Sequence, residues 1–236
     1  MTVFLNQLLK AHNLACIQKS VAIKKQWKVN DMPDAYDADH IVIGLDIKGY
    51  SMRDISRQMA AQEVLDRCLQ EAFPDTAQHG STVIWIDGGD GGYLLLEGSP
   101  QNALAGIQKF YERLAWANKN GRQDDPVYVR AAIHIDKLLR WKSARFGARY
   151  TGNAINDCSR LLNGMNKNMV GQVVCSGDFL MKLNLINLDV VHERLRDITD
   201  KHGKAHTVFN IYRTPGFGTV AAKEDRNTDV LEWLSK

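Results

Sequence analysis

Residues 41–51, with the sequence IVIGLDIKGYS, decide the fold. The first seven are almost continuously apolar and rich in β-branched side chains, which is typical of a strand buried on both faces. A tight turn at Lys48, Gly49 and Tyr50 follows, and Ser51 with Asp54 three residues on resembles a capping box. We expect a strand that leads through this turn into a long helix, with Asp46 as the strand's one carboxylate.

The segments that follow alternate between helical and strand patterns. Apolar residues continue at helical spacing through Met52, Ile55, Met59, Val64, Leu65, Cys68, Leu69 and Phe73. Residues 82–86 and 93–96 then predict a β-hairpin whose turn, DGGDGG, is rich in glycine. Ser99 and Pro100 predict the start of a helix that ends near Asn118, and a strand is expected from Val127 to Ile135.

The last elements complete an α+β pattern. We expect a helix from Asn153 to about Gly164, a short strand at 172–175 and a closing strand at 205–212. This order suits a ferredoxin-like α+β sandwich, in which helices flank an antiparallel-rich sheet. Residues 1–36 are expected to form a helical extension and linker, residues 37–213 the folded domain, and residues 214–236 a tail.

Composition narrows the partners and the location. The 236 residues carry a net charge of +3 from 30 basic and 27 acidic side chains that are mixed along the chain, which argues against a nucleic-acid surface. The sequence shows neither a leader pattern nor a membrane-length apolar run, so we expect a cytoplasmic protein. The cysteines, Cys16, Cys68, Cys158 and Cys175, have no zinc-type spacing and are expected to be buried free thiols.

Two aspartates in the predicted elements suggest a metal site. Asp46 lies near the end of the buried strand and Asp90 lies in the glycine-rich turn, so the two converge if their strands are neighbours. Converging carboxylates repel each other unless a cation joins them, and oxygen ligands favour magnesium or manganese. Gly49, Gly89 and their neighbours allow close backbone approach, and the amides after Tyr50 at the helix start offer a place for phosphate.

The predicted helix at residues 153–164 contributes a second polar pair. Asn156 and Arg160 are four residues apart and share one helical face. A neutral amide and a guanidinium suit a reaction in which a ribose hydroxyl is oriented and charge grows on a phosphoryl group. Taken alone, the pair is equally consistent with a solvated helix face.

The three segments together, LDIKGYS at 45–51, GDG at 89–91 and GxxINxxxRL at 152–161, resemble the signature of class III adenylate and guanylate cyclases over residues 40–212. The resemblance implies that residues 37–213 are a cyclase catalytic domain. It also implies that Asp46 and Asp90 hold two Mn²⁺ or Mg²⁺ ions, assisted by the carbonyl of Ile47. Asn156 and Arg160 would then act across a homodimer with shared active sites.

The positions that read the base depart from both purine patterns. Where adenylate cyclases carry lysine and aspartate, this chain has Ile86, or Asp87 in the adjacent register, and Arg149 or Tyr150. The sequence is also similar to the pyrimidine cyclases of bacterial Pycsar anti-phage systems, whose product triggers a separate effector protein. This similarity favours UTP as substrate, with CTP as the other candidate. The residues expected to contact substrate are Gly49, Tyr50, Ser51, Ile86, Gly89 and Arg149; Tyr50 is equally interpretable as a packing residue.

Other functions remain as alternatives. The substrate of such a cyclase can instead be ATP or GTP, and the non-enzymatic reading is an inactive cyclase-like regulator. Gly88-Gly89-Asp90 is also similar to the turn of diguanylate cyclases, but the chain continues with two glycines and carries the Asn156/Arg160 helix. His134, between two isoleucines, is interpreted as a core or interface histidine, and the charged residues 192–204 as a solvated loop.

Overall fold

The computed structural model describes residues 36–74, 83–121, 124–145, 147–165, 169–184, 191–195, 197–199, 203 and 205–212. The expected extension, apart from Tyr36, and the expected tail lie outside these residues. The described chain divides into two units. The larger, the body, comprises the described residues of Ala38–Leu138 and Gly152–Lys236, and the smaller contains the segment Leu139–Thr151.

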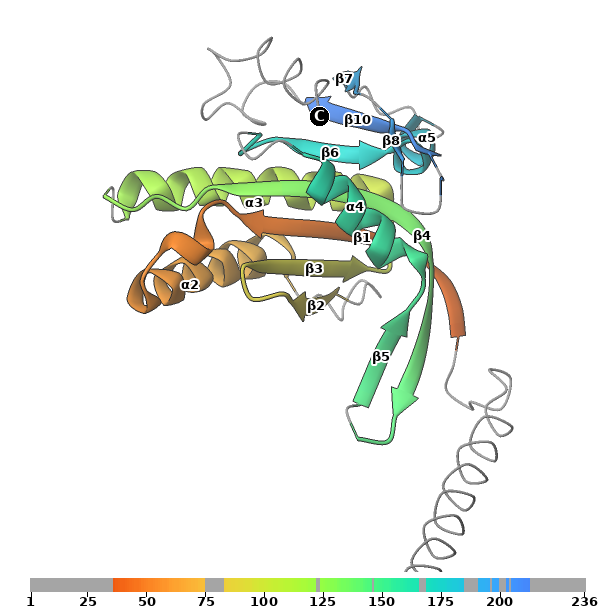
Figure 1. Cartoon of the computed structure of the whole chain (residues 1–236), viewed down its shortest axis with the longest axis horizontal. Helices are drawn as coiled ribbons and strands as arrows, with labels where there is room; N and C mark the ends of the chain where they lie inside the picture. The colour runs from red at the N-terminus through yellow and green to blue at the C-terminus, as the bar shows by residue number, and fades with distance from the viewer. Residues whose placement is uncertain are drawn as a thin grey trace, which may run out of the picture. The chain divides into compact units, whose positions relative to one another are not determined.

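A mostly antiparallel sheet forms the centre of the fold, with strand order β2-β3-β1-β4-β6-β10-β7 (Figure 1). Antiparallel pairing joins β1 to β3, β3 to β2, and β10 to β6 and β7, whereas β4 and β6 are parallel. The bounds are β1 Tyr36–Ile47, β2 Val83–Asp87, β3 Gly91–Leu96, β4 Val129–Ser143, β6 Val173–Ser176, β7 Val191–Arg194 and β10 Val208–Tyr212. Two short strands, β8 Ile198–Thr199 and β9 Ala205–His206, form a separate pair.

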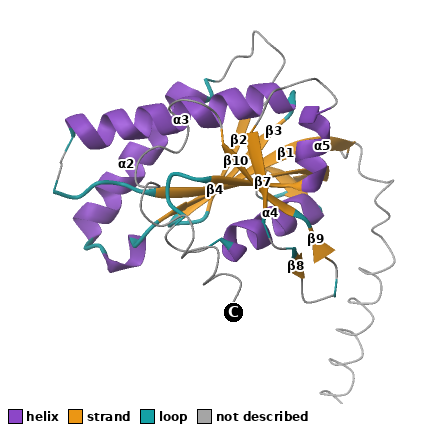
Figure 2. Ribbon diagram, turned by 90° about the horizontal axis from the view of Figure 1, so that it is seen from above, coloured by secondary structure: helices purple, strands orange, loops and turns teal. Residues whose placement is uncertain are grey.

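Helices cover both faces of the sheet (Figure 2). Helices α2 (Ile55–Ala72) and α3 (Pro100–Asn120) lie on one face, and α4 (Asn153–Gly164) lies on the other. A strand's side chains alternate between faces, so Ile43 and Leu45 join the core under α2 and α3. Val42 and Gly44 belong to the α4 face, where the Cys158 thiol donates to the Val42 carbonyl over 3.4 Å. Asp46 continues this second set toward the end of β1.

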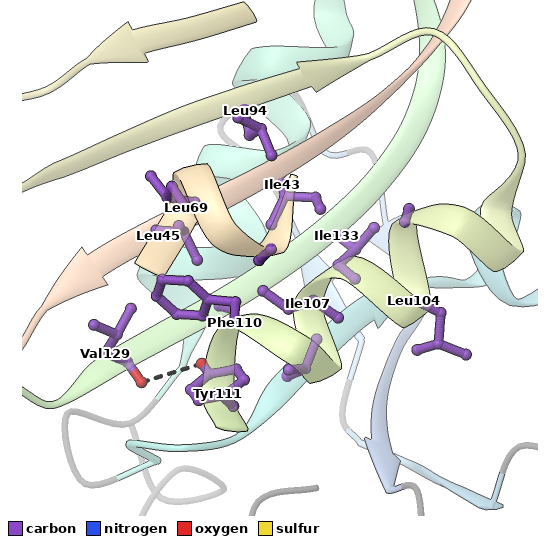
Figure 3. Packing of buried hydrophobic residues seen from close by; sticks show 14 of the residues in the cluster. Ile43, Leu45, Leu69, Leu94, Leu104, Ile107, Phe110, Tyr111, Val129 and Ile133 are labelled. Atoms are coloured by element: carbon purple, nitrogen blue, oxygen red, sulfur yellow. Dashed lines mark hydrogen bonds between the residues drawn. The ribbon is translucent and has the colours of Figure 1, made fainter. Parts of the chain in front are cut away.

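The main core fills the space between the sheet and the α2–α3 pair (Figure 3). Phe110 and Ile107 of α3 are fully buried there beside Ile43 and Ile133. The buried Tyr111 hydroxyl lies 3.2 Å from the carbonyl oxygen of Val129, to which it donates, so the polar end of the ring is satisfied inside the core. Helices α2 and α3 therefore cover one face of the sheet, and Asp46 and Arg130 lie on the other.

The expected α+β architecture is confirmed, with local corrections. The helix after the first strand does not begin at Ser51: Tyr50–Met52 forms a 3₁₀ turn, and Asp54 is the N-cap of α2, accepting from the Arg57 amide. Met52, Ile55 and Met59, the first apolar residues of the predicted helix, are exposed rather than buried. Strand β4 runs past Ile135 to Ser143 and pairs with β5 (Gly147–Thr151), and α5 (Gly177–Asn184) follows β6. Within the expected loop at 192–204, residues 192–194 belong to β7.

The described cysteines are buried free thiols, as expected; Cys16 lies outside the described residues. Burial raises the pKa of Cys158 to about 12 and that of Cys68 to about 11, and it raises the pKa of Cys175 as well. These groups are therefore protonated, unreactive thiols near pH 8. In a Cys16→Ser variant, we expect a thiol reagent to label the protein only at the rate of unfolding in native buffer and at once in urea. Rapid native labelling would contradict the burial.

None of the helices within the described part of the chain is long and apolar enough to span a bilayer.

Candidate active site

The register of β1 and β3 brings the two predicted metal ligands onto neighbouring strands. Asp46 lies opposite Gly91, and the Ile47 amide donates to the carbonyl oxygen of Asp90 over 2.8 Å. Asp46 is partly buried, whereas Asp90 is exposed in the turn. The Ile47 side chain points into the core, so only its backbone is available to a ligand. A strand end and a hairpin turn thus place two carboxylates at the same edge of the sheet.

The turn between β2 and β3 depends on glycine for its close approach to β1. Gly91 has a φ of +157°, and a Cβ atom there would lie 2.1 Å from the carbonyl oxygen of Leu45. Gly89, with a φ of +87°, has open space around it instead. The Gly88 amide donates to the Gly91 carbonyl over 2.9 Å and closes the turn. The glycine pattern seen in the sequence therefore fixes the backbone next to Asp90.

Arg130 is a site residue that the sequence analysis missed. It lies on β4, and its Nε and Nη2 donate to Asp46 Oδ2 over 2.9 and 2.6 Å. Its Nη1 donates to the Met165 carbonyl at the end of α4, over 2.9 Å. An arginine in the middle of the apolar segment 127–135 was the available signal, because such a side chain needs a buried partner.

The ion pair between Arg130 and Asp46 indicates whether a metal ion fits the site. The Asp46 carboxylate, with 23% of the side chain exposed, already binds a cationic group, and the Asp90 carboxylate is on the adjacent strand. Carboxylate oxygens together with a backbone carbonyl are the donors that Mg²⁺ and Mn²⁺ prefer. The donor set at this edge of the sheet is therefore compatible with the expected divalent ions.

The turn after β1 contains three of the predicted substrate contacts. Gly49 adopts the left-handed conformation, with a φ of +67°, and is the N-cap of the 3₁₀ turn. Tyr50 is half-buried and packs against the hydrophobic core, which supports its interpretation as a packing residue. Ser51 is exposed. The turn thus exposes its backbone and Ser51 next to the Asp46 strand end.

Helix α4 presents Asn156 and Arg160 on the same sheet face as Asp46. Asn156 is exposed and Arg160 is partly buried. Arg160 forms an ion pair with Asp157, one turn earlier on the same helix and almost fully buried. In this chain, therefore, Arg130 pairs with the strand-end aspartate, and Arg160 pairs with an aspartate of its own helix.

The two predicted base-reading residues belong to different units. Ile86 is half-buried on β2 and lies opposite Tyr93, whose ring lies beside Gly44 on the α4 face. Arg149 is exposed on β5, opposite Trp141 in the smaller unit. Ile86 therefore shares the sheet face of Asp46, and Arg149 is placed only within its own hairpin.

Comparisons with known proteins identify the fold. No protein-family model and no curated protein matches the sequence. The adenylyl cyclase CyaB from P. aeruginosa matches the structure with a TM-score of 0.61 at 14% identity, over 78% of this chain and 98% of that chain. An adenylate/guanylate cyclase/hydrolase from Silicibacter pomeroyi matches with a TM-score of 0.57 at 17% identity, over 76% of this chain and 99% of that one.

A third solved structure gives the same result. The guanylate cyclase domain of RhGC from Catenaria anguillulae, solved in complex with GTP, matches with a TM-score of 0.59 at 13% identity, over 76% of this chain and 98% of that chain. The chain therefore has the class III cyclase fold, a mixed α+β domain with a mostly antiparallel sheet flanked by helices.

Proposed function

We propose that this chain is a nucleotide cyclase that converts a pyrimidine nucleoside triphosphate, UTP in preference to CTP, into the 3′,5′-cyclic monophosphate and pyrophosphate. The β1–β3 register carries the proposal, because it places Asp46 next to the Asp90 turn at one edge of the sheet. In the reaction the ribose 3′-hydroxyl gives its proton to water, its oxygen forms a bond to the α-phosphorus, and the bond from that phosphorus to the bridging oxygen breaks, so that pyrophosphate leaves.

Each polar group of the site has a role in that reaction. Asp46 and Asp90 would hold two divalent ions, which when bound favour loss of the 3′-hydroxyl proton and neutralise the triphosphate. Arg130 donates to Asp46 through Nε and Nη2 and would hold that carboxylate in position for a metal ion. Asn156 would orient the ribose, and Arg160 would stabilise negative charge at the reacting phosphorus.

A homodimer would bring these groups together in two shared sites. Exposed apolar side chains support an interface beside the Gly49–Ser51 turn: Met52 is 90% exposed, Ile55 85% and Met59 61%, all on the first turns of α2 or just before it. Neighbouring exposed apolar residues on a soluble domain mark an interaction surface. We assign this surface, defined by Met52, Ile55 and Met59, to contact with a second copy of the chain.

The choice of a pyrimidine rests on the residues at the base-reading positions. The aligned positions hold Ile86, or Asp87 in the adjacent register, and Arg149 or Tyr150, so neither purine pattern is present. Together with the similarity to Pycsar cyclases, this favours UTP and a role in anti-phage signalling through a separately encoded effector. The solved neighbours are adenylyl and guanylyl cyclases, so a purine cyclase is the alternative that the substrate test must separate.

Incubating the purified protein with all four ribonucleoside triphosphates and Mn²⁺ tests the proposal. We expect mass spectrometry to detect cyclic UMP above cyclic CMP, and no cyclic product from an Asp46→Asn variant that unfolds at the same urea concentration. Cyclic AMP or cyclic GMP as the main product would overturn the pyrimidine assignment while retaining the cyclase. The absence of any cyclic product would support the inactive-regulator alternative.

A further inference from the structure

A buried group of polar side chains beneath α4 is separate from the Asp46 and Asp90 carboxylates. His134 of β4 is 3% exposed, Asp157 of α4 is 1% exposed and His206 of β9 is 7% exposed. Asp157 Oδ2 lies 4.0 Å from His134 Nε2 and 3.9 Å from His206 Nδ1. Burial of so many titratable groups is costly unless they share a proton or a cation.

The His134 ring is held so that one nitrogen faces the cluster without a hydrogen bond. His134 Nδ1 is hydrogen-bonded to Ser176 Oγ over 2.8 Å, and the Phe179 amide donates to the same oxygen over 3.2 Å. His134 Nε2 is buried and has no hydrogen-bond partner among the residues that the structure describes. His134 Nε2 faces the Asp157 carboxylate, and with the ring proton on Nδ1 its lone pair would be available to a metal ion, as in metal-binding histidines whose other ring nitrogen is hydrogen-bonded.

A second carboxylate lies beside this pair. Asp136 follows His134 by two residues on β4 and therefore lies on the same face of the sheet. His134, Asp136 and Asp157 each offer a ligand atom within 4.8 Å of the others. The Asp136 carboxylate also accepts from the Lys137 amide through Oδ1, over 2.8 Å. Ligand atoms around a tetrahedral Zn²⁺ are about 3.4 Å apart, so binding needs only a small contraction.

We propose that His134, Asp136 and Asp157 form a Zn²⁺ site beneath α4, separate from the carboxylates at the sheet edge. One imidazole with two carboxylates favours Zn²⁺ over Mg²⁺, because Mg²⁺ prefers oxygen ligands alone. The fourth position is left for water.

The site is linked to Arg160 through the two oxygens of one carboxylate. Asp157 pairs with Arg160 through Oδ1, whereas Oδ2 faces the histidines. A metal on Oδ2 therefore leaves the ion pair on Oδ1 in place and fixes the Asp157 side chain that orients Arg160. The inference does not depend on the proposed reaction, because it concerns metal binding to the folded chain.

Equilibrium dialysis of the full chain against micromolar Zn²⁺ with millimolar Mg²⁺, followed by elemental analysis, tests the site. We expect one Zn²⁺ per chain in the parent and in two controls, Asp90→Asn and His192→Gln, the latter at an exposed position on β7. His134→Gln and Asp136→Asn should each weaken Zn²⁺ binding more than tenfold. The Asp136→Asn variant covers the case in which the buried His134 change prevents folding.

Binding of Zn²⁺ to the folded chain should also raise the melting temperature of the parent and not that of Asp136→Asn. Visible absorption by bound Co²⁺ should report a nitrogen ligand that is lost with His134→Gln. Retention of Zn²⁺ by Asp136→Asn with its loss from Asp90→Asn would place the ion at the sheet edge and overturn the proposal. An absence of Zn²⁺ from the parent would also overturn the proposal, and a stoichiometry unaffected by every variant would indicate an adventitious ion only.

Discussion

Mixing Asp46→Ala subunits with Arg160→Ala subunits should restore about one quarter of wild-type cyclase activity, although each variant alone should be inactive. Asp46 and Arg160 belong to different halves of the proposed shared site. Random exchange makes about half of the dimers hybrid, and each hybrid contains one site with both substitutions and one with neither. Co-expression with two affinity tags, followed by sequential purification, would isolate these hybrids, whose activity in a product assay should be about half that of the wild type because one of their two sites is intact.

The matched control is a mixture of Asp46→Ala with Asp90→Ala. Both substitutions affect the same edge of the sheet, so every site of that hybrid lacks one carboxylate and should remain inactive. Asn156→Ala can replace Arg160→Ala, because Asn156 is exposed and its loss leaves the Asp157 ion pair intact. Equal inactivity of both hybrids would show that each chain works alone and would contradict the shared site.

Local sequence patterns predicted the elements that carry the carboxylates. The apolar segment at 41–47 forms part of β1, and the glycine-rich turn is a hairpin in which Asp90 follows Gly89. The helix expected at 153–164 has those bounds in the structure. In each case the signal lay within a single element, either a continuous apolar segment or a turn rich in glycine.

Features that depend on distant partners were not predicted. The pairing of Arg130 with Asp46 joins residues 84 apart in sequence, and no local pattern encodes such a contact. The charged sequence of the β4–β5 hairpin, including Arg140 and Lys142, lacks the apolar alternation of a half-buried strand. The apolar face predicted for the first helix included Met52 and Ile55, but both side chains are exposed. Periodicity specifies the face of a helix but not what covers that face.

The close approach of the Asp90 turn to β1 makes Gly91→Ala the substitution with the largest expected effect on folding. Its Cβ would lie 2.1 Å from the Leu45 carbonyl oxygen and 3.0 Å from Asp46 Cα, and both are backbone atoms that cannot rotate away. The positive φ of Gly91 adds strain. We expect a loss of about 3 kcal/mol in the free energy of unfolding, measured by urea titration.

Gly89→Ala is the matched control from the same turn. Its φ is also positive, at +87°, but no atom lies within 4 Å of the added Cβ. That variant should lose about 1 kcal/mol through backbone strain alone. The excess loss in Gly91→Ala then measures the contact between β3 and β1 that sets the spacing of Asp46 and Asp90.

Gly91→Ala should also weaken metal binding, because the added Cβ displaces β3 from β1 and moves the Asp90 carboxylate away from that of Asp46. The folded fraction of Gly91→Ala should therefore require more Mn²⁺ for half-maximal activity, whereas Gly89→Ala should not. Equal losses of stability in the two variants would mean that the strands can separate without cost, and the close β1–β3 approach would no longer account for the site.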